Sequence, residues 1–149
     1  MLIAKGEAMK PIKLEIEGLN SFESRQVLDF EKLGDGVFGI FGKTGSGKST
    51  ILDAITLALY GKLERIKQNI NFINTKCSSA EAALVFEIFH AGKTRRYEVV
   101  RTFSKKKNGK DVDSTAVLYE LADGDKKLVE EGTNKVSDKI FSIIGLGAK

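Results

Sequence analysis

The alternation of apolar and polar residues along the chain predicts a strand-rich domain. Residues 12–17 alternate strictly, as a strand with one buried face does. Further strands are predicted over 27–30, 37–41, 82–90, 96–103 and 115–122. A tight turn over 91–93 and a longer basic loop over 104–113 would join the last three of these strands as hairpins. The pattern therefore predicts a sheet as the main body of the domain.

Two segments have apolar residues at helical spacing instead. The first covers 49–60, and Gly61 stands where a residue with left-handed backbone would end the helix. The second covers 133–145, with Thr133 as its N-cap and Gly145 as its stop. The interpretation is an α/β or α+β domain with one central and one closing helix.

The pattern G-x-x-x-x-G-K-S lies between the predicted strand 37–41 and the first helix. It consists of Gly42, Lys43, Thr44, Gly45, Ser46, Gly47, Lys48 and Ser49, and Thr50 extends the polar start of the helix. The glycines let the backbone curl so that successive N–H groups point at one anion, and the helix adds the partial positive charge of its N-terminus. Lys48 would reach the β- and γ-phosphates, and the Ser49 hydroxyl would ligate Mg²⁺. We interpret the segment as a phosphate loop that binds a nucleoside triphosphate with Mg²⁺.

Composition changes this picture little. The chain has 149 residues, of which 42% are hydrophobic and 30% charged, as in one ordinary globular domain. No apolar run approaches the length of a membrane span, and the N-terminus does not resemble a signal peptide. A single cysteine, Cys77, suits a reducing compartment, so we expect a cytoplasmic location. Residues 1–8 show no pattern and are expected to be a frayed extension or a cloning remnant, which leaves 9–149 as the domain.

Charge is spread unevenly along the chain. The formal net charge is +4, but residues 91–110 carry eight basic residues and one acidic residue, so the rest of the chain is negative. The basic residues of this window are Lys93, Arg95, Arg96, Arg101, Lys105, Lys106, Lys107 and Lys110. The asymmetry predicts one basic face for a polyanionic partner, with Lys105, Lys106 and Lys107 as candidates for contact with DNA. The alternative is that these lysines merely solvate a hairpin tip.

The groups with which a P-loop ATPase activates water are not found in this sequence. Such an enzyme places an acidic residue after an apolar strand, whereas the nearest candidate, 118–123, is interrupted by Glu120. We therefore expect the chain to bind ATP without hydrolysing it. Asp53 is interpreted as a complement to the helix dipole and His90 as a solvated or packing residue, neither being catalytic.

From residue 12 to residue 148 the chain resembles the N-terminal lobe of the SbcC family, break-repair ATPases related to SMC proteins. The resemblance lies in residues 19–22, the phosphate loop, 52–61, 83–87 and 96–101. It implies an α/β P-loop NTPase of the ABC type, in which a strand-rich mixed sheet surrounds the phosphate-loop helix. It also implies that Asn20 and Ser21, and by a looser match Asn74 and Thr75, lie near the nucleotide.

The resemblance implies partners as well. In this family the ATPase head is assembled from two chain ends joined by a long coiled coil, and ATP is sandwiched between two heads. The expected partners are a C-terminal lobe of the same chain, a second head, a nuclease subunit and DNA. The coiled coil and the remaining catalytic motifs would lie beyond Lys149.

Other interpretations remain open at this point. The same lobe could belong to another SMC-like or recombination ATPase. A small P-loop kinase would need paired arginines in a lid, and the only arginine pair, Arg95 and Arg96, precedes a predicted strand. A module that only mediates interactions would bind no nucleotide at all.

Overall fold

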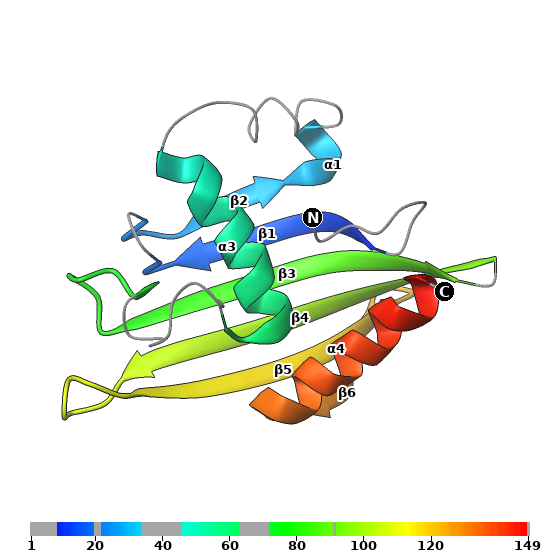
Figure 1. Ribbon diagram of the computed structural model, residues 1–149. Coiled ribbons are helices and arrows are strands. Elements are labelled where there is room, and N and C mark those ends of the chain that lie inside the picture. Colours follow the sequence, from blue (N-terminus) through cyan, green and yellow to red (C-terminus); the bar gives the residue numbers. More distant parts are fainter. Residues whose placement is uncertain (1–8, 20–21, 34–45, 63–71, 91, 149) are drawn as a thin grey trace.

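The computed structural model describes residues 9–19, 22–33, 46–62, 72–90 and 92–148, and within these the side chains of 33, 46–50, 90 and 145–148 are not described. The described strands are β1 (Lys10–Glu17), β2 (Gln26–Asp29), β3 (Ser79–His90), β4 (Lys93–Lys105), β5 (Val112–Ala122) and β6 (Asp125–Glu131). The described helices are α1 (Phe30–Leu33), α3 (Ser46–Tyr60) and α4 (Thr133–Ala148). The strands form a six-stranded sheet in the order β2-β1-β3-β4-β5-β6 (Figure 1).

The predicted strand-rich sheet is confirmed for the described part of the chain. Every described pairing is antiparallel, and the long hairpins β3–β4 and β4–β5 form its centre. The strand predicted over 37–41 lies outside the described residues. One strand was not predicted: β6 is mostly charged and lacks an apolar alternation, but the tight turn before it aligns its backbone with β5. Both turn residues, Asp123 and Gly124, have positive φ, 53° and 80°, as the favoured two-residue hairpin turn requires.

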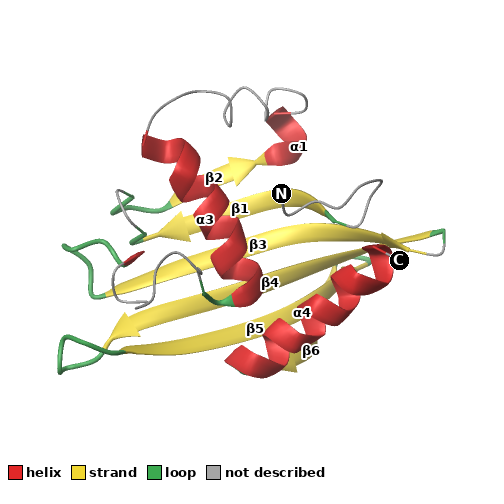
Figure 2. Cartoon of the chain, in the orientation of Figure 1, coloured by secondary structure: helices red, strands yellow, loops and turns green. Residues whose placement is uncertain are grey.

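Both long helices cover the same face of the sheet (Figure 2). Alternate residues of the strands point toward them, and in β3 these are Ala82, Leu84 and Phe86, each fully buried. The predicted apolar faces of the helices are also confirmed. The helical residues buried in this core include Ile51, Ala54, Ile55, Ala58 and Leu59 from α3 and Val136, Ile140 and Ile143 from α4. The layer between sheet and helices is therefore the hydrophobic core.

The structure corrects several predicted boundaries. Phe30 begins α1 and does not end a strand, because the Asp29 carboxylate accepts hydrogen bonds from the backbone N–H groups of Glu31 and Lys32 and so caps the helix. The N-cap of α4 is Gly132 and not Thr133, since the Gly132 carbonyl accepts the first helical hydrogen bond. The same helix continues past the predicted stop to Ala148, because a glycine inside a helix costs only about 1 kcal/mol.

Gly18, at the end of β1, is expected to be intolerant of substitution. Its φ is +72°, and an added Cβ would lie 2.3 Å from the backbone oxygen of Ser79. Because backbone atoms must move to relieve this overlap, Gly18→Ala should lower the free energy of unfolding by about 3 kcal/mol. Gly109→Ala is the matched control, with φ +73° and nothing within 4 Å of the added Cβ, and should cost about 1 kcal/mol. Urea unfolding would measure both, and equal losses would contradict the steric argument.

Candidate nucleotide-binding site

The predicted phosphate loop leads directly into the start of α3. The helix begins at Ser46, three residues before the predicted start, so that residues 46–50 form its first turns. Gly42, Lys43, Thr44 and Gly45 lie outside the described residues, and the side chains of Ser46, Lys48, Ser49 and Thr50 are not described. The first N–H groups of a helix have no partner within it, and a helix of 15 residues directs its dipole toward a ligand at this end. This backbone arrangement fits a bound phosphate group.

The end of β1 and the residues before β3 meet at one end of the sheet, the end toward which the start of α3 also lies (Figure 1). The backbone N–H of Asn74 donates to the carbonyl of Gly18 over 2.7 Å, and Leu19 forms an isolated antiparallel β-bridge with Ile73. Asn74 also organises its own turn, since its side-chain oxygen accepts from the N–H of Lys76 over 2.8 Å. Thr75 is exposed in this turn.

The structure thus brings Asn74 beside the residues that immediately precede Asn20. Asn20 and Ser21 themselves lie outside the described residues. Their nearness to a nucleotide stays a prediction, as does that of Asn74 and Thr75.

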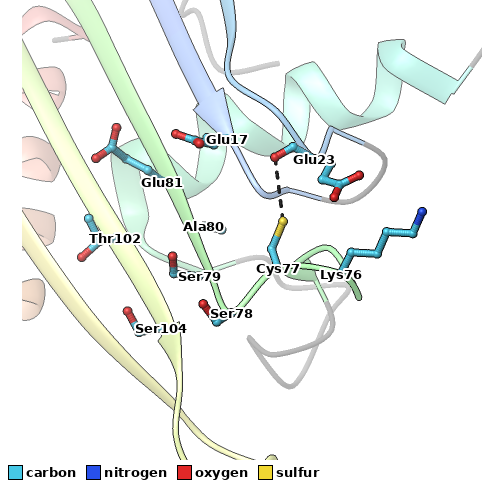
Figure 3. Close-up of a pocket in the computed structure, with 10 residues that line it drawn as sticks. All are labelled: Glu17, Glu23, Lys76, Cys77, Ser78, Ser79, Ala80, Glu81, Thr102 and Ser104. Carbon is cyan, nitrogen blue, oxygen red and sulfur yellow. Dashed lines mark hydrogen bonds between the residues drawn. The ribbon is translucent and has the colours of Figure 1, made fainter.

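A cavity of about 600 Å³ opens beside the same turn (Figure 3). Its lining includes three carboxylates, those of Glu17, Glu23 and Glu81, and the hydroxyls of Ser78, Ser79, Thr102 and Ser104. Arg25 faces the acidic side, and its shortest ion pair joins it to Glu81 over 2.6 Å. The hydrogen bond from Arg25 to that carboxylate raises the pKa of Arg25. Lys76 also lines the cavity, but the three carboxylates outnumber it, and because carboxylates repel a triphosphate this cavity does not suit the phosphates.

The prediction of one basic face is wrong. The window 91–110 runs the length of β4, whose 13 residues extend about 40 Å, so its two hairpin loops lie at opposite ends of the sheet (Figure 2). Several of its cations are also paired. Arg96 contacts Glu87 over 2.8 Å and Glu31 over 3.3 Å, and Lys106 lies 3.6 Å from Asp113.

The remaining basic cluster is the hairpin tip between β4 and β5. Lys105, Lys106, Lys107 and Lys110 lie in or beside it, and all but Lys105 are exposed. The Lys105 ammonium approaches the carbonyl of Asn74 over 3.5 Å, so this tip adjoins the turn described above. The structure therefore places the lysines that were predicted to contact DNA at the same end of the sheet as the Asn74 turn (Figure 1).

Arg101 is a structural residue, although its charge suggested a place on the surface. It is only 1% exposed and donates from Nε to the carbonyl of Ala58 over 2.8 Å and from Nη2 to that of Leu59 over 2.9 Å. Burial lowers its pKa to about 10, which leaves the guanidinium charged at pH 7. The sequence did contain a signal for this burial, because Arg101 stands two residues from each of the buried Val99 and Phe103, on the same face of the strand.

Two acidic residues also occupy places that bear on the predictions. Asp53 lies two turns into α3, whose first turn holds no acidic residue, so the interpretation as a complement to the helix dipole is wrong. Asp123 belongs to the tight turn between β5 and β6 and not to the end of an apolar strand facing the start of α3. The rejection of 118–123 as the catalytic acidic segment stays a prediction.

The described side chains add no metal ligand to the predicted Ser49. Among the described residues, no group of three or more His, Cys, Asp and Glu side chains is arranged to hold a metal ion. None of the helices in the described part of the chain is long and apolar enough to cross a membrane.

Comparison with known proteins agrees with the phosphate loop. A family model described as an AAA domain matches residues 13–146. The chain belongs to this family of P-loop nucleotide-binding domains.

Several curated relatives extend this result. The chain is 46% identical over 141 residues to the SbcC subunit of the nuclease SbcCD from Clostridium acetobutylicum, and 42% identical over 142 residues to the protein of the same name from Bacillus subtilis. It is 36% identical over 143 residues to a probable DNA double-strand break repair Rad50 ATPase of Aquifex aeolicus. These alignments cover 93%, 93% and 95% of this chain but 12%, 12% and 13% of the relatives, so the chain spans about an eighth of their length. The resemblance to the SbcC family is confirmed.

Proposed function

We propose that this chain is the ATP-binding N-terminal lobe of an SbcC-type ATPase head of the ABC type, which acts with a nuclease subunit on DNA ends in the cytoplasm. The observation that carries the proposal is the phosphate-loop pattern ending in the first turns of a long helix. The similarity to relatives named as a subunit of the nuclease SbcCD and as a break-repair ATPase supports the DNA-directed part.

The site would use its residues as follows. The backbone N–H groups of 42–47 would cradle the phosphates of ATP, Lys48 would neutralise charge on the β- and γ-phosphates, and Ser49 would hold Mg²⁺. Asn20, Ser21, Asn74 and Thr75 would lie along the nucleotide, on the side of the sheet where the Asn74 turn meets β1. The C-terminal lobe and a second head would complete the site.

The kinase alternative receives no support from the described structure. Arg95 and Arg96 lie inside β4, and Arg96 is held by two carboxylates. Paired arginines that close over a phosphate must be able to move onto it. Arg96 is held in this way, and Arg95 is exposed near the start of the same strand, so the pair belongs to a sheet and not to a lid.

The chain by itself is expected to bind Mg²⁺-ATP without turning it over. Phosphoryl transfer depends on an oriented water and on neutralised charge, and loss of one preorganised group costs about 10²–10³ in rate. Phosphate release and sedimentation with and without Mg²⁺-ATP would test this, with Lys48→Ala as the blank. Hydrolysis above the blank, or a dimer that forms only with ATP, would show that the catalytic site is built within this chain.

The β4–β5 hairpin tip is expected to contact DNA through phosphates. Such contacts release counterions, so binding should weaken steeply with salt and show little sequence preference. Replacing Lys105, Lys106 and Lys107 together with Gln should reduce the slope of log affinity against log salt by about two to three. The reduction should be smaller if Lys105 and Lys106 keep their contacts with Asn74 and Asp113 when DNA is bound. The control is the opposite hairpin, with Lys93→Gln and Arg95→Gln. An unchanged slope in the triple variant would favour a tip that is merely solvated.

A further inference from the structure

The C-terminal end of α3 is fully partnered, and most of its partners come from other elements. The last four carbonyls of a helix find no donor within it and need donors from outside. Here the carbonyl of Leu57 accepts from the N–H of Gly61 over 2.8 Å. Those of Ala58 and Leu59 accept from Arg101 of β4.

The fourth carbonyl brings in α4. The Ser137 hydroxyl donates to the carbonyl of Tyr60 over 3.1 Å and accepts from Nη2 of Arg101 over 2.9 Å. A hydroxyl has one proton to donate and lone pairs to accept with, so both bonds can exist together. Arg101 and Ser137, which we term the α3 clamp, therefore join the end of α3 to both β4 and α4.

The junction where the clamp lies is not closely packed, although apolar residues of α3 and α4 share the hydrophobic core. A cavity of about 570 Å³ opens there, lined among others by Tyr60, Arg101, Ser137 and Asp138. Gly61 closes over the guanidinium with φ +78°, and an added Cβ would lie 2.8 Å from Nη1 of Arg101. No carboxylate within the described residues forms an ion pair with Arg101, so its positive charge is balanced by the helix carbonyls and the negative end of the α3 dipole.

We propose that Arg101 and Ser137 are positioning residues for the nucleotide site, which fix the far end of α3 and link its position to that of α4. The proposal rests on nucleotide binding at the start of α3. Phosphate bound at one end of a rigid helix restrains the whole helix, and the clamp passes that restraint to α4 through Ser137. Residues of α4 thereby respond to nucleotide that they do not touch.

Amide hydrogen exchange can test this linkage in the chain as it stands, without reference to hydrolysis. The variant is Ser137→Ala, which removes the link to α4 and keeps Arg101. The matched control is Ser142→Ala, an exposed serine of the same helix for which the described structure shows no hydrogen bond. Ser137→Thr should restore the link, because it restores the hydroxyl. Exchange is followed with and without Mg²⁺-ATP in the first turns of α3 and in α4.

In the wild type, the Ser142→Ala control and Ser137→Thr, we expect nucleotide to slow exchange in both helices. In Ser137→Ala, nucleotide should protect α3 while most of the protection in α4 is lost. Without nucleotide, Ser137→Ala should speed exchange roughly fivefold in the last turn of α3 and the first turns of α4 together, the factor for one net hydrogen bond.

The outcomes separate the two proposals. Equal nucleotide protection of α4 with and without the Ser137 hydroxyl would overturn the linkage, as would a wild type in which α3 alone is protected. A wild type in which neither helix responds to Mg²⁺-ATP would refute the proposed function. The nucleotide-free comparison still decides the linkage in that case, because faster exchange confined to one helix would show that the clamp does not join the two.

Discussion

Mg²⁺-ATP at about a hundred times its dissociation constant should raise the free energy of unfolding of the wild type by roughly 2.7 kcal/mol. For a domain of this size, that corresponds to an increase in melting temperature of about 5–10 °C. Lys48→Ala should lose nearly all of the increase, because the lysine ammonium is expected to supply the main point charge to the β- and γ-phosphates. Thermal melts of both proteins with and without nucleotide would measure the difference.

Lys127→Ala is the matched control for this experiment. Lys127 is exposed on β6, the edge strand opposite β2 in the sheet. Its substitution changes the net charge by the same amount as Lys48→Ala. Its nucleotide shift should equal that of the wild type. An equal shift in Lys48→Ala would mean that nucleotide binds somewhere other than the start of α3.

Arg101→Met should be the most destabilising substitution of a basic residue in the described chain. It leaves the buried carbonyls of Ala58 and Leu59 without donors, and each unsatisfied group costs about 1–3 kcal/mol. The lowered pKa of Arg101 shows that burial of its charge opposes folding at pH 7, and this opposition weakens only as the pH rises above about 10. After this offset of about 3 kcal/mol, the expected loss is about 1–3 kcal/mol, or roughly 2–12 °C in melting temperature.

Arg95→Met tests whether the effect belongs to the clamp. Arg95 lies on the same strand but is exposed, so its substitution should change stability by about 0.5 kcal/mol at most. Denaturant unfolding of both variants gives the comparison. Similar losses, or a stabilised Arg101→Met protein, would mean that burying the guanidinium costs as much as its hydrogen bonds contribute.

Local rules were enough to predict most of the elements. Alternation located the strands around Leu14, Leu84 and Val99, since a half-buried strand leaves a period of two in its own sequence. Gly61 was placed correctly as a left-handed terminator because glycine alone adopts that conformation without strain. The phosphate loop was visible for the same reason, because its chemistry depends on neighbouring residues of one short segment.

Local rules failed where a partner distant in sequence decides the outcome. The strand β6 carries no apolar alternation and exists because a tight turn folds it against β5. The basic window looked like one surface because its residues are adjacent in sequence, but an extended strand carries its two ends about 40 Å apart.

The sequence alone therefore determined the phosphate loop, the family and the helical and strand periodicities. The tertiary structure decided what Arg101 does. The charge of Arg101 suggested an exposed position, whereas its place in the alternation of β4 indicated a buried one. The carbonyls at the end of α3 favour the buried position, because they accept its hydrogen bonds. Those carbonyls come from residues more than forty positions away, and the Ser137 hydroxyl from a helix at the other end of the chain. No local sequence pattern predicts these contacts, because they form only when the sheet and both helices have packed together.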